Sequence, residues 1–355
     1  MTQTTHFFLG ANSGEGFQNL YPLLTDREDT YDLMILKGGP GVKKSDFLMQ
    51  LGETMEKAGV RTEYLWCARD PASLDGVAFP DLKTAAVDGA EPHVLEPEYP
   101  GAVDRCVDLG RFYDLTAAKA ARPEVLALTR SYRSAYARAC HSLKAARQME
   151  LDGVTAVRRT MDWQRANRRL NGIIARELRH RGGEAGKTTV RFLGGMTQKG
   201  WVWRFDTVDA LCPRVYVLAD SYELAGDLLE RLHATAVRQG WDTITCMAPE
   251  EPSRIEHLLI PGLGLAFVTS KPGMEYGKKP YRRMRLDAMA QPENRARLRF
   301  EARMTGILRE EARSALEEAK EVYDRLEEVY APYVDDDGIQ ATAALETGRL
   351  LSYLK

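Results

Sequence analysis

The sequence repeats itself once, and this repeat limits the possible folds more than any other feature. Three segments recur in the same order: residues 8–17 as 192–201, 33–36 as 215–218, and 73–82 as 254–263. The offset between the copies drifts only from 184 to 181 residues. Similar segments at a nearly constant offset indicate two copies of one structural unit. We therefore predict two related domains, residues 1–186 and 187–355.

Both halves carry the same order of predicted elements. Three apolar strands are expected in each half, at 31–37, 61–67 and 83–88, and at 214–219, 242–247 and 263–269. An amphipathic helix that ends near a glycine separates the first two strands, at 44–58 and at 224–238. Helices between strands predict βαβ units, an α/β fold and parallel sheets. Long helical sequence then closes each half, at 127–148 and 293–330, and predicts appended helical hairpins.

A glycine-rich loop follows the first predicted strand. The segment from Lys37 to Ser45, KGGPGVKKS, is similar to the phosphate-binding pattern G-x-x-x-x-G-K-[ST] between a strand and a helix. Glycines allow backbone N–H groups to surround phosphate oxygens, and the helix N-terminus adds positive charge. The loop predicts phosphate binding by the residues Gly38, Gly39, Gly41, Lys43, Lys44 and Ser45. In this pattern the lysine reaches the phosphates and the Ser45 hydroxyl ligates Mg²⁺.

One position departs from the pattern, because Lys43 stands where the second glycine is expected. A side chain on a left-handed residue costs about 1–2 kcal/mol, which could distort the loop. Alternatively, Lys43 adds a second cation beside the phosphates. In the second half, Gly226 and Asp227 replace Lys44 and Ser45, so that half is expected to have lost the site.

Acidic residues lie at the predicted carboxyl edge of the first sheet. Asp88 ends the third strand, where an acid is expected to assist Mg²⁺ beside a phosphate loop. Asp70 and Asp75 follow the second strand, and either could position water or a substrate hydroxyl, together with Lys44 as a catalytic group. Turn formation and helix capping explain these two aspartates equally well. His93 is a further candidate, although a surface loop is the commoner place for such a histidine.

The sequence resembles a bacterial group of tandem P-loop ATPase-like proteins with two halves. The resemblance covers most of the chain and rests on FFLGANSGEGF, LKGGPGVKKS, CARDPASLDGVAFPDLKTAAVDGAEPH, EYPGAVD and IEHLLIPGLGLAFVTS. It implies that Gly38, Gly41, Lys44 and Ser45 bind nucleotide and that Asp88 assists Mg²⁺. The altered Lys43 and the erased second loop depart from the family pattern.

Charge is separated along the chain, although the total is only −2. Residues 122–181 contain 14 Lys/Arg against 5 Asp/Glu, whereas residues 315–346 contain 10 Asp/Glu against 2 Lys/Arg. The basic segment could bind nucleic acid weakly, or the two segments could pack against each other. Five scattered cysteines without a CxxC pair favour a reduced, cytoplasmic protein. No apolar stretch approaches the roughly 18 residues of a membrane helix, so no membrane association is expected.

Two functions remain open from the sequence. The first is binding of ATP with Mg²⁺, as a weak NTPase, a nucleotide-dependent switch or a kinase of a small molecule. The second is a non-catalytic scaffold that binds a protein or nucleic-acid partner through its helical hairpins. The intact Lys44 and Ser45 favour the first function, and Lys43 favours the second.

Overall fold

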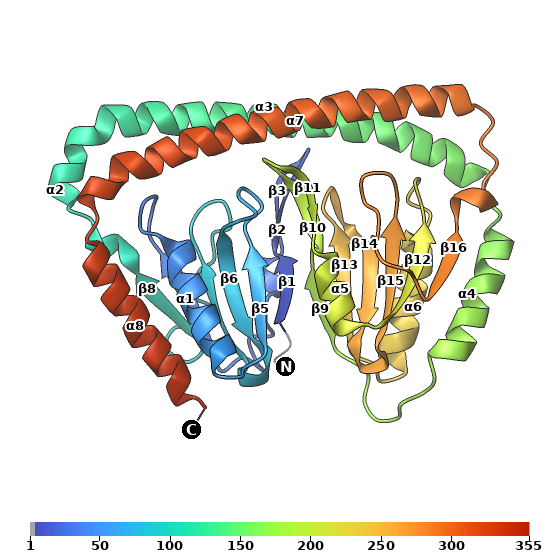
Figure 1. Cartoon of the computed structure of the whole chain (residues 1–355), viewed down its shortest axis with the longest axis horizontal. Helices are drawn as coiled ribbons and strands as arrows, with labels where there is room; N and C mark the ends of the chain where they lie inside the picture. Colours follow the sequence, from blue (N-terminus) through green and yellow to red (C-terminus); the bar gives the residue numbers. More distant parts are fainter. Residues whose placement is uncertain (1–3, 355) are drawn as a thin grey trace.

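Two six-stranded sheets stand side by side below a pair of long helices, as the computed structural model shows for residues 4–354 (Figure 1). The first half contains β1 (Thr4–Phe8), β2 (Gly10–Ser13), β3 (Gly16–Asn19), β4 (Asp32–Lys37), α1 (Lys44–Lys57), β5 (Thr62–Trp66), β6 (Leu74–Phe79), β7 (Thr84–Asp88), β8 (Asp104–Asp108), α2 (Leu115–Ala118), α3 (Arg122–Arg159) and α4 (Trp163–Glu177). The second contains β9 (Thr188–Arg191), β10 (Gly194–Thr197), β11 (Gly200–Trp203), α5 (Phe205–Leu211), β12 (Arg214–Ala219), α6 (Gly226–Arg238), β13 (Thr243–Ala248), β14 (Glu251–Ile260), β15 (Leu265–Ser270), β16 (Arg282–Arg285), α7 (Arg295–Tyr330) and α8 (Asp336–Ser352). Within these residues, no helix combines the length and the apolar character that crossing a membrane requires.

The two large sheets share one topology. Their strand orders are β1-β5-β6-β7-β4-β8 and, read from the other end, β9-β13-β14-β15-β12-β16. The α/β class predicted from the sequence is therefore confirmed, and the two halves repeat each other strand by strand.

The expectation of wholly parallel sheets is wrong, because β6 and β14 run antiparallel to both of their neighbours. No strand is expected between the predicted strands 61–67 and 83–88, whereas residues 74–79 form β6. Short links on either side of β6 allow only hairpin connections, since a parallel crossover needs a dozen or more residues. Every residue of β6 is buried, so the strand lacks the polar–apolar alternation by which an antiparallel strand is usually recognised.

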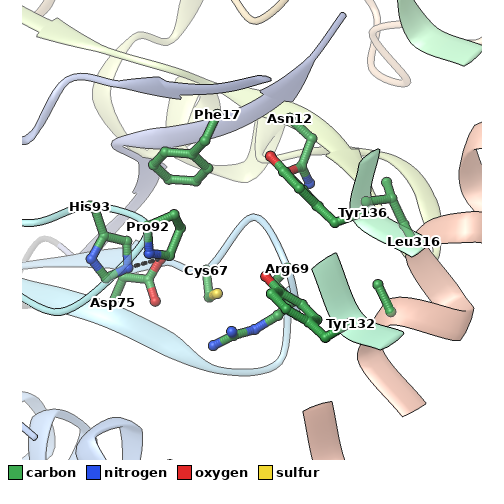
Figure 2. Close-up of a pocket in the computed structure, with 11 residues that line it drawn as sticks. Asn12, Phe17, Cys67, Arg69, Asp75, Pro92, His93, Tyr132, Tyr136 and Leu316 are labelled. Carbon is green, nitrogen blue, oxygen red and sulfur yellow. Dashed lines mark hydrogen bonds and ion pairs between the residues drawn. The ribbon is translucent and has the colours of Figure 1, made fainter. Parts of the chain in front are cut away.

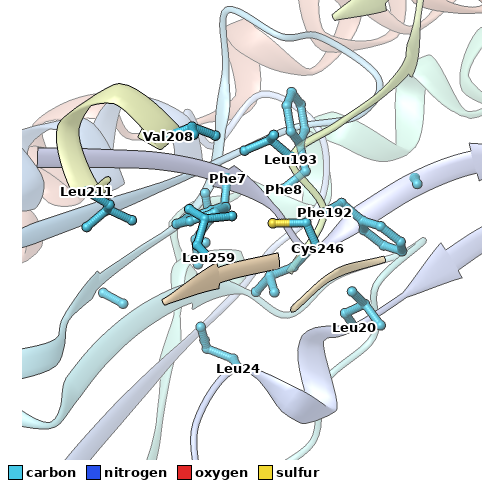
Figure 3. Close-up of a cluster of buried hydrophobic side chains, with 14 of the residues drawn as sticks. Phe7, Phe8, Leu20, Leu24, Phe192, Leu193, Val208, Leu211, Cys246 and Leu259 are labelled. Carbon is cyan, nitrogen blue, oxygen red and sulfur yellow. The ribbon is translucent and has the colours of Figure 1, made fainter. Parts of the chain in front are cut away.

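A small central sheet joins the halves, in the order β11-β10-β2-β3. Asn12 of β2 pairs with Met196 of β10 and also donates from its side chain to the Met196 carbonyl at 2.9 Å. Below this sheet, Phe8 and Phe192 bridge the halves and lie in one buried cluster with Cys246 and Leu259 (Figure 3). The halves therefore share a hydrophobic core.

The long helices cross from one half to the other, and this differs from the expected hairpins. Helix α3 lies against α7 along the length of the molecule and does not fold back on α4 (Figure 1). Helix α4 then packs against α6 of the second half, whereas α8 returns to pack against α1 of the first. The predicted boundary at residues 186 and 187 falls in the loop before β9, so each half is covered by a helix from the other.

The basic and acidic helical segments lie against each other. Arg138 of α3 pairs with Glu318 and, at 3.5 Å, with Glu311 of α7. In the reverse direction, Arg309 of α7 reaches Glu150 of α3 at 2.8 Å. The charge separation along the chain is thus partly neutralised across the α3–α7 contact.

Candidate functional site

The glycine-rich loop connects β4 to α1 and bends through several left-handed residues. Gly38 has φ +153°, Gly41 has φ +86° and Lys43 has φ +45°. A Cβ on Gly38 would come within 2.9 Å of the Val42 side chain, so this glycine is required by space as well as by conformation. The loop ends at the N-terminus of α1. The first N–H groups of a helix lack helical partners and favour binding of an anion.

Lys43 takes the left-handed conformation but points away from the loop. Its ammonium group pairs with Asp336 in the first turn of α8, and this hydrogen bond raises the pKa of Lys43. The side chain that replaces the expected glycine is therefore engaged by a helix of the other half. Lys43 is not placed as the second cation that the sequence analysis considered.

Lys44, Ser45 and Asp88 come together at the carboxyl edge of the first sheet. The Lys44 ammonium donates to the Gly38 carbonyl at 2.8 Å and lies 2.9 Å from the Asp88 carboxylate. Asp88 is there because β7 runs parallel to β4, with Asp88 opposite Leu36. The Ser45 hydroxyl accepts a hydrogen bond from the Leu74 N–H at 2.9 Å. A hydroxyl oxygen has a second lone pair, so Ser45 keeps the capacity to ligate a cation.

Asp75 lies in the same place, next to His93. Asp75 is 4% exposed and His93 is 2% exposed, and the Asp75 carboxylate is 3.4 Å from Nε2 of His93. Burial alone would raise the pKa of Asp75, but the imidazole and the Arg69 guanidinium reverse this effect and lower it. Burial alone would lower the pKa of His93, but Asp75 raises it. A surface loop is the commoner place for such a histidine, whereas His93 is stacked on Tyr21 in the interior.

Asp70 does not join this group. Its carboxylate accepts hydrogen bonds from the Ala72 N–H at 3.1 Å and from the Ser73 hydroxyl at 3.2 Å, which stabilises the turn between β5 and β6. It also lies 3.5 Å from Lys320 of α7. These contacts favour turn formation by Asp70 over the positioning of water or a substrate hydroxyl.

A small pocket opens beside Asp75 and His93 (Figure 2). The β2–β3 hairpin, the loop after β5 and the helices α3 and α7 enclose it, with the side chains Asn12, Phe17, Cys67, Arg69, Asp75, Pro92, His93, Tyr132, Tyr136, Leu316 and Ala319. The Arg69 guanidinium lies over the Tyr323 ring at 3.6 Å. Sequence reasoning missed Arg69 and the tyrosines, because helices distant in the sequence bring them to the sheet edge.

The corresponding loop of the second half is closed by its own carboxylate. Asp220 accepts hydrogen bonds from the N–H groups of Leu224 at 2.9 Å and Ala225 at 2.8 Å, at the start of α6. Glu223 has φ +56° and pairs with Arg147 of α3 at 2.6 Å. A side-chain carboxylate thus takes up N–H groups of the loop before α6, at the place where an external anion would bind.

Comparisons of the chain with protein-family models, with curated proteins and with solved structures gave no match.

Proposed function

We propose that the first half binds a nucleoside triphosphate, with ATP as the first candidate, together with Mg²⁺. The observation that carries the proposal is the position of Lys44, which starts α1 behind a loop with left-handed residues and faces Asp88. The ammonium group would exchange its contact with the Gly38 carbonyl for phosphate oxygens. The N-terminus of α1 would hold the same phosphates through unpaired N–H groups.

The residues at the sheet edge fit a hard cation beside those phosphates. Ser45 and Asp88 offer oxygen ligands, which Mg²⁺ prefers in proteins. Bound Mg²⁺ would neutralise charge on the phosphates. Asp75 would accept a proton or orient water next to Asp88, since its lowered pKa keeps it ionised at neutral pH. This arrangement supports slow hydrolysis or a nucleotide-dependent switch.

Calorimetric titration of the full chain with ATP and MgCl₂ tests the proposal. We expect saturable binding at one site per chain, weakened at least 100-fold by Lys44→Ala. Lys57→Ala is the matched control, because Lys57 lies at the other end of α1, is 77% exposed and should leave binding unchanged. Absence of saturable binding, or equal binding by the Lys44→Ala variant, would contradict the proposal.

A second candidate is weak binding of a nucleic-acid backbone by α4. Arg165, Arg168 and Arg169 of this helix are exposed and form no ion pair within residues 4–354, in contrast to Arg138 of α3. Exposed arginines on one helix attract phosphates in a salt-dependent manner. Retention on single-stranded RNA that falls with salt and with charge reversal at these three residues would support it. Retention unchanged by the reversal would rule out α4 as the contact.

A further inference from the structure

Three ligand-bearing side chains converge at the carboxyl edge of the first sheet from three consecutive segments. Asp75 belongs to β6, Asp88 ends β7, and His93 follows in the turn after β7. One ligand atom from each, two carboxylate oxygens and an imidazole nitrogen, lie within 4.8 Å of one another. All three residues are at least nine-tenths buried. Figure 2 shows the carboxylate of Asp75 facing the imidazole of His93 at the wall of the pocket.

One atom of this group lacks the partner that a buried polar atom normally has. Within the described part of the chain, Nδ1 of His93 makes no hydrogen bond, whereas Oδ2 of Asp75 faces Nε2 of the same ring at 3.4 Å. Buried polar atoms are almost always satisfied, and exceptions commonly mark a site for an ion or water. The group therefore has the atoms to hold a ligand, and one buried imidazole nitrogen without a partner.

The second half provides an internal comparison, because strand register identifies the equivalent positions. Leu36 pairs with Asp88 in the first sheet and Leu218 with Thr269 in the second, so Thr269 replaces Asp88. By the same register Glu256 stands for Asp75. Met274 stands for His93 by position, because each lies five residues after Thr269 or Asp88 and closes a turn onto the carbonyl three residues earlier. Glu256 and Met274 also line a pocket in the second half, as Asp75 and His93 do in the first.

The changes in the second half remove two of the three ligands and keep a carboxylate at the position of Asp75. Two of the three ligand positions become Thr269 and Met274, which are poor ligands for hard or borderline cations. Lys44 and Ser45 are lost in the same half, replaced by Gly226 and Asp227. Residues that disappear together from one copy of a repeat are best explained by one shared role.

We propose that Asp75, Asp88 and His93 bind one divalent transition-metal ion, of the class of Mn²⁺, Co²⁺ or Zn²⁺. A nitrogen ligand with two carboxylates favours these ions, whereas Mg²⁺ prefers oxygen ligands alone. The site differs in its ligands from the Ser45–Asp88 pair considered for Mg²⁺, and it does not require a nucleotide. The nearest competing charge is the Lys44 ammonium at 2.9 Å from Asp88, so Lys44 weakens metal binding.

Titration of the full chain with Co²⁺ in the absence of nucleotide, followed by its visible absorption, tests the site. We expect one Co²⁺ per chain, with affinity reduced at least tenfold by Asp75→Asn and by His93→Gln. The control is His141→Gln, since His141 is exposed on α3 and should leave the affinity unchanged. Lys44→Ala should increase the affinity for Co²⁺ because it removes the competing ammonium, while it weakens ATP binding at least 100-fold. The same variant thus separates failure of the metal site from failure of the nucleotide site.

If the variants fold poorly, pulsed electron paramagnetic resonance of Mn²⁺ bound to the wild-type protein tests whether His93 ligates the metal ion. Coupling of Mn²⁺ to an imidazole nitrogen in the wild-type protein is the expected result. Absence of Co²⁺ binding, Mn²⁺ bound without nitrogen coupling, or equal Co²⁺ affinity in the folded His93→Gln and Asp75→Asn variants would each overturn the proposal.

Discussion

Lys43 carries two opposing contributions to stability within one residue. Its left-handed backbone costs about 1–2 kcal/mol for a residue with a Cβ, while its exposed ion pair with Asp336 offsets at most about 1 kcal/mol. Substituting Lys43→Gly and Lys43→Ala removes the ion pair in both variants, but only glycine relieves the backbone. We expect the free energy of unfolding in urea to be about 1–2 kcal/mol higher for Lys43→Gly than for Lys43→Ala. Equal stabilities would show that the left-handed backbone is not strained.

His257 makes stability depend on pH. It is fully buried, accepts a hydrogen bond from the Thr269 N–H at 3.1 Å, and has its pKa lowered to about 3 by burial, with Lys271 and Arg254 adding to the effect. The neighbouring Glu256 lies 3.9 Å from Nε2 of the ring, and burial raises its own pKa.

The unfolded chain binds a proton on this histidine near pH 6.5, whereas the folded chain does not until about pH 3. The buried neutral His257 therefore costs no stability well above pH 6.5, and the free energy of unfolding falls as the pH decreases from 6.5 toward 3. Between pH 7 and 5 the loss from this one group is about 2 kcal/mol. Urea unfolding at both pH values should show this loss in the wild-type protein, and a loss smaller by about that amount in His257→Gln. The same loss in both proteins would assign it to other groups.

At the residue scale, the sequence predicted the positions of those site residues that depend on a single loop or on neighbouring strands. The spacing of Lys44 and Ser45 depends on one loop and one helix start, and Asp88 follows from the parallel pairing of neighbouring strands. His93 was harder to assign, because its burial depends on stacking against Tyr21, far away in the sequence. Nothing local to Lys43 could show that its ammonium is held by Asp336 of α8.

At the element scale, α3 and α7 approach closely because small residues face each other. Alanines are buried along both helices, at Ala135, Ala139, Ala146, Ala312, Ala315 and Ala319. A larger side chain at the centre of such a contact must displace its neighbours, which costs about 1–3 kcal/mol. We expect Ala315→Leu to lower the free energy of unfolding by this amount, measured in urea. Ser314→Leu is the matched control, because Ser314 is exposed on the same turn, and an equal loss there would contradict the argument.

The positions of most elements followed from periodicity, but their partners did not. The helix expected at 44–58 is observed at Lys44–Lys57, and the one expected at 293–330 at Arg295–Tyr330. An amphipathic face shows that a helix packs against something, without showing against what. The crossing of α4 to α6 and of α8 to α1 is set by tertiary packing alone, and the expectation of separate hairpins therefore failed.

At the scale of the whole molecule, these crossings make the two halves mutually dependent. Helix α8 buries Ile339, Ala343 and Leu350 over the first half, although it lies at the end of the second. Phe8 and Phe192 close the shared core between the sheets. The glycine-rich loop of the first half is itself contacted by elements of the second half, because Tyr330 of α7 lies beside Gly41 and Asp336 of α8 pairs with Lys43.

Cleavage between the halves tests this dependence directly. Gly182 and Gly183 lie in an exposed loop before β9, so a specific protease site inserted between them should be cut without disturbing the fold. Because α3 packs on α7, α4 on α6 and α8 on α1, we expect the two fragments to elute together in gel filtration as one particle of the uncut size. The fragments should separate only when urea is added at a concentration that also unfolds the uncut chain. Separation of folded fragments in native buffer would show instead that each half folds independently and that the crossed helices contribute little to holding them together.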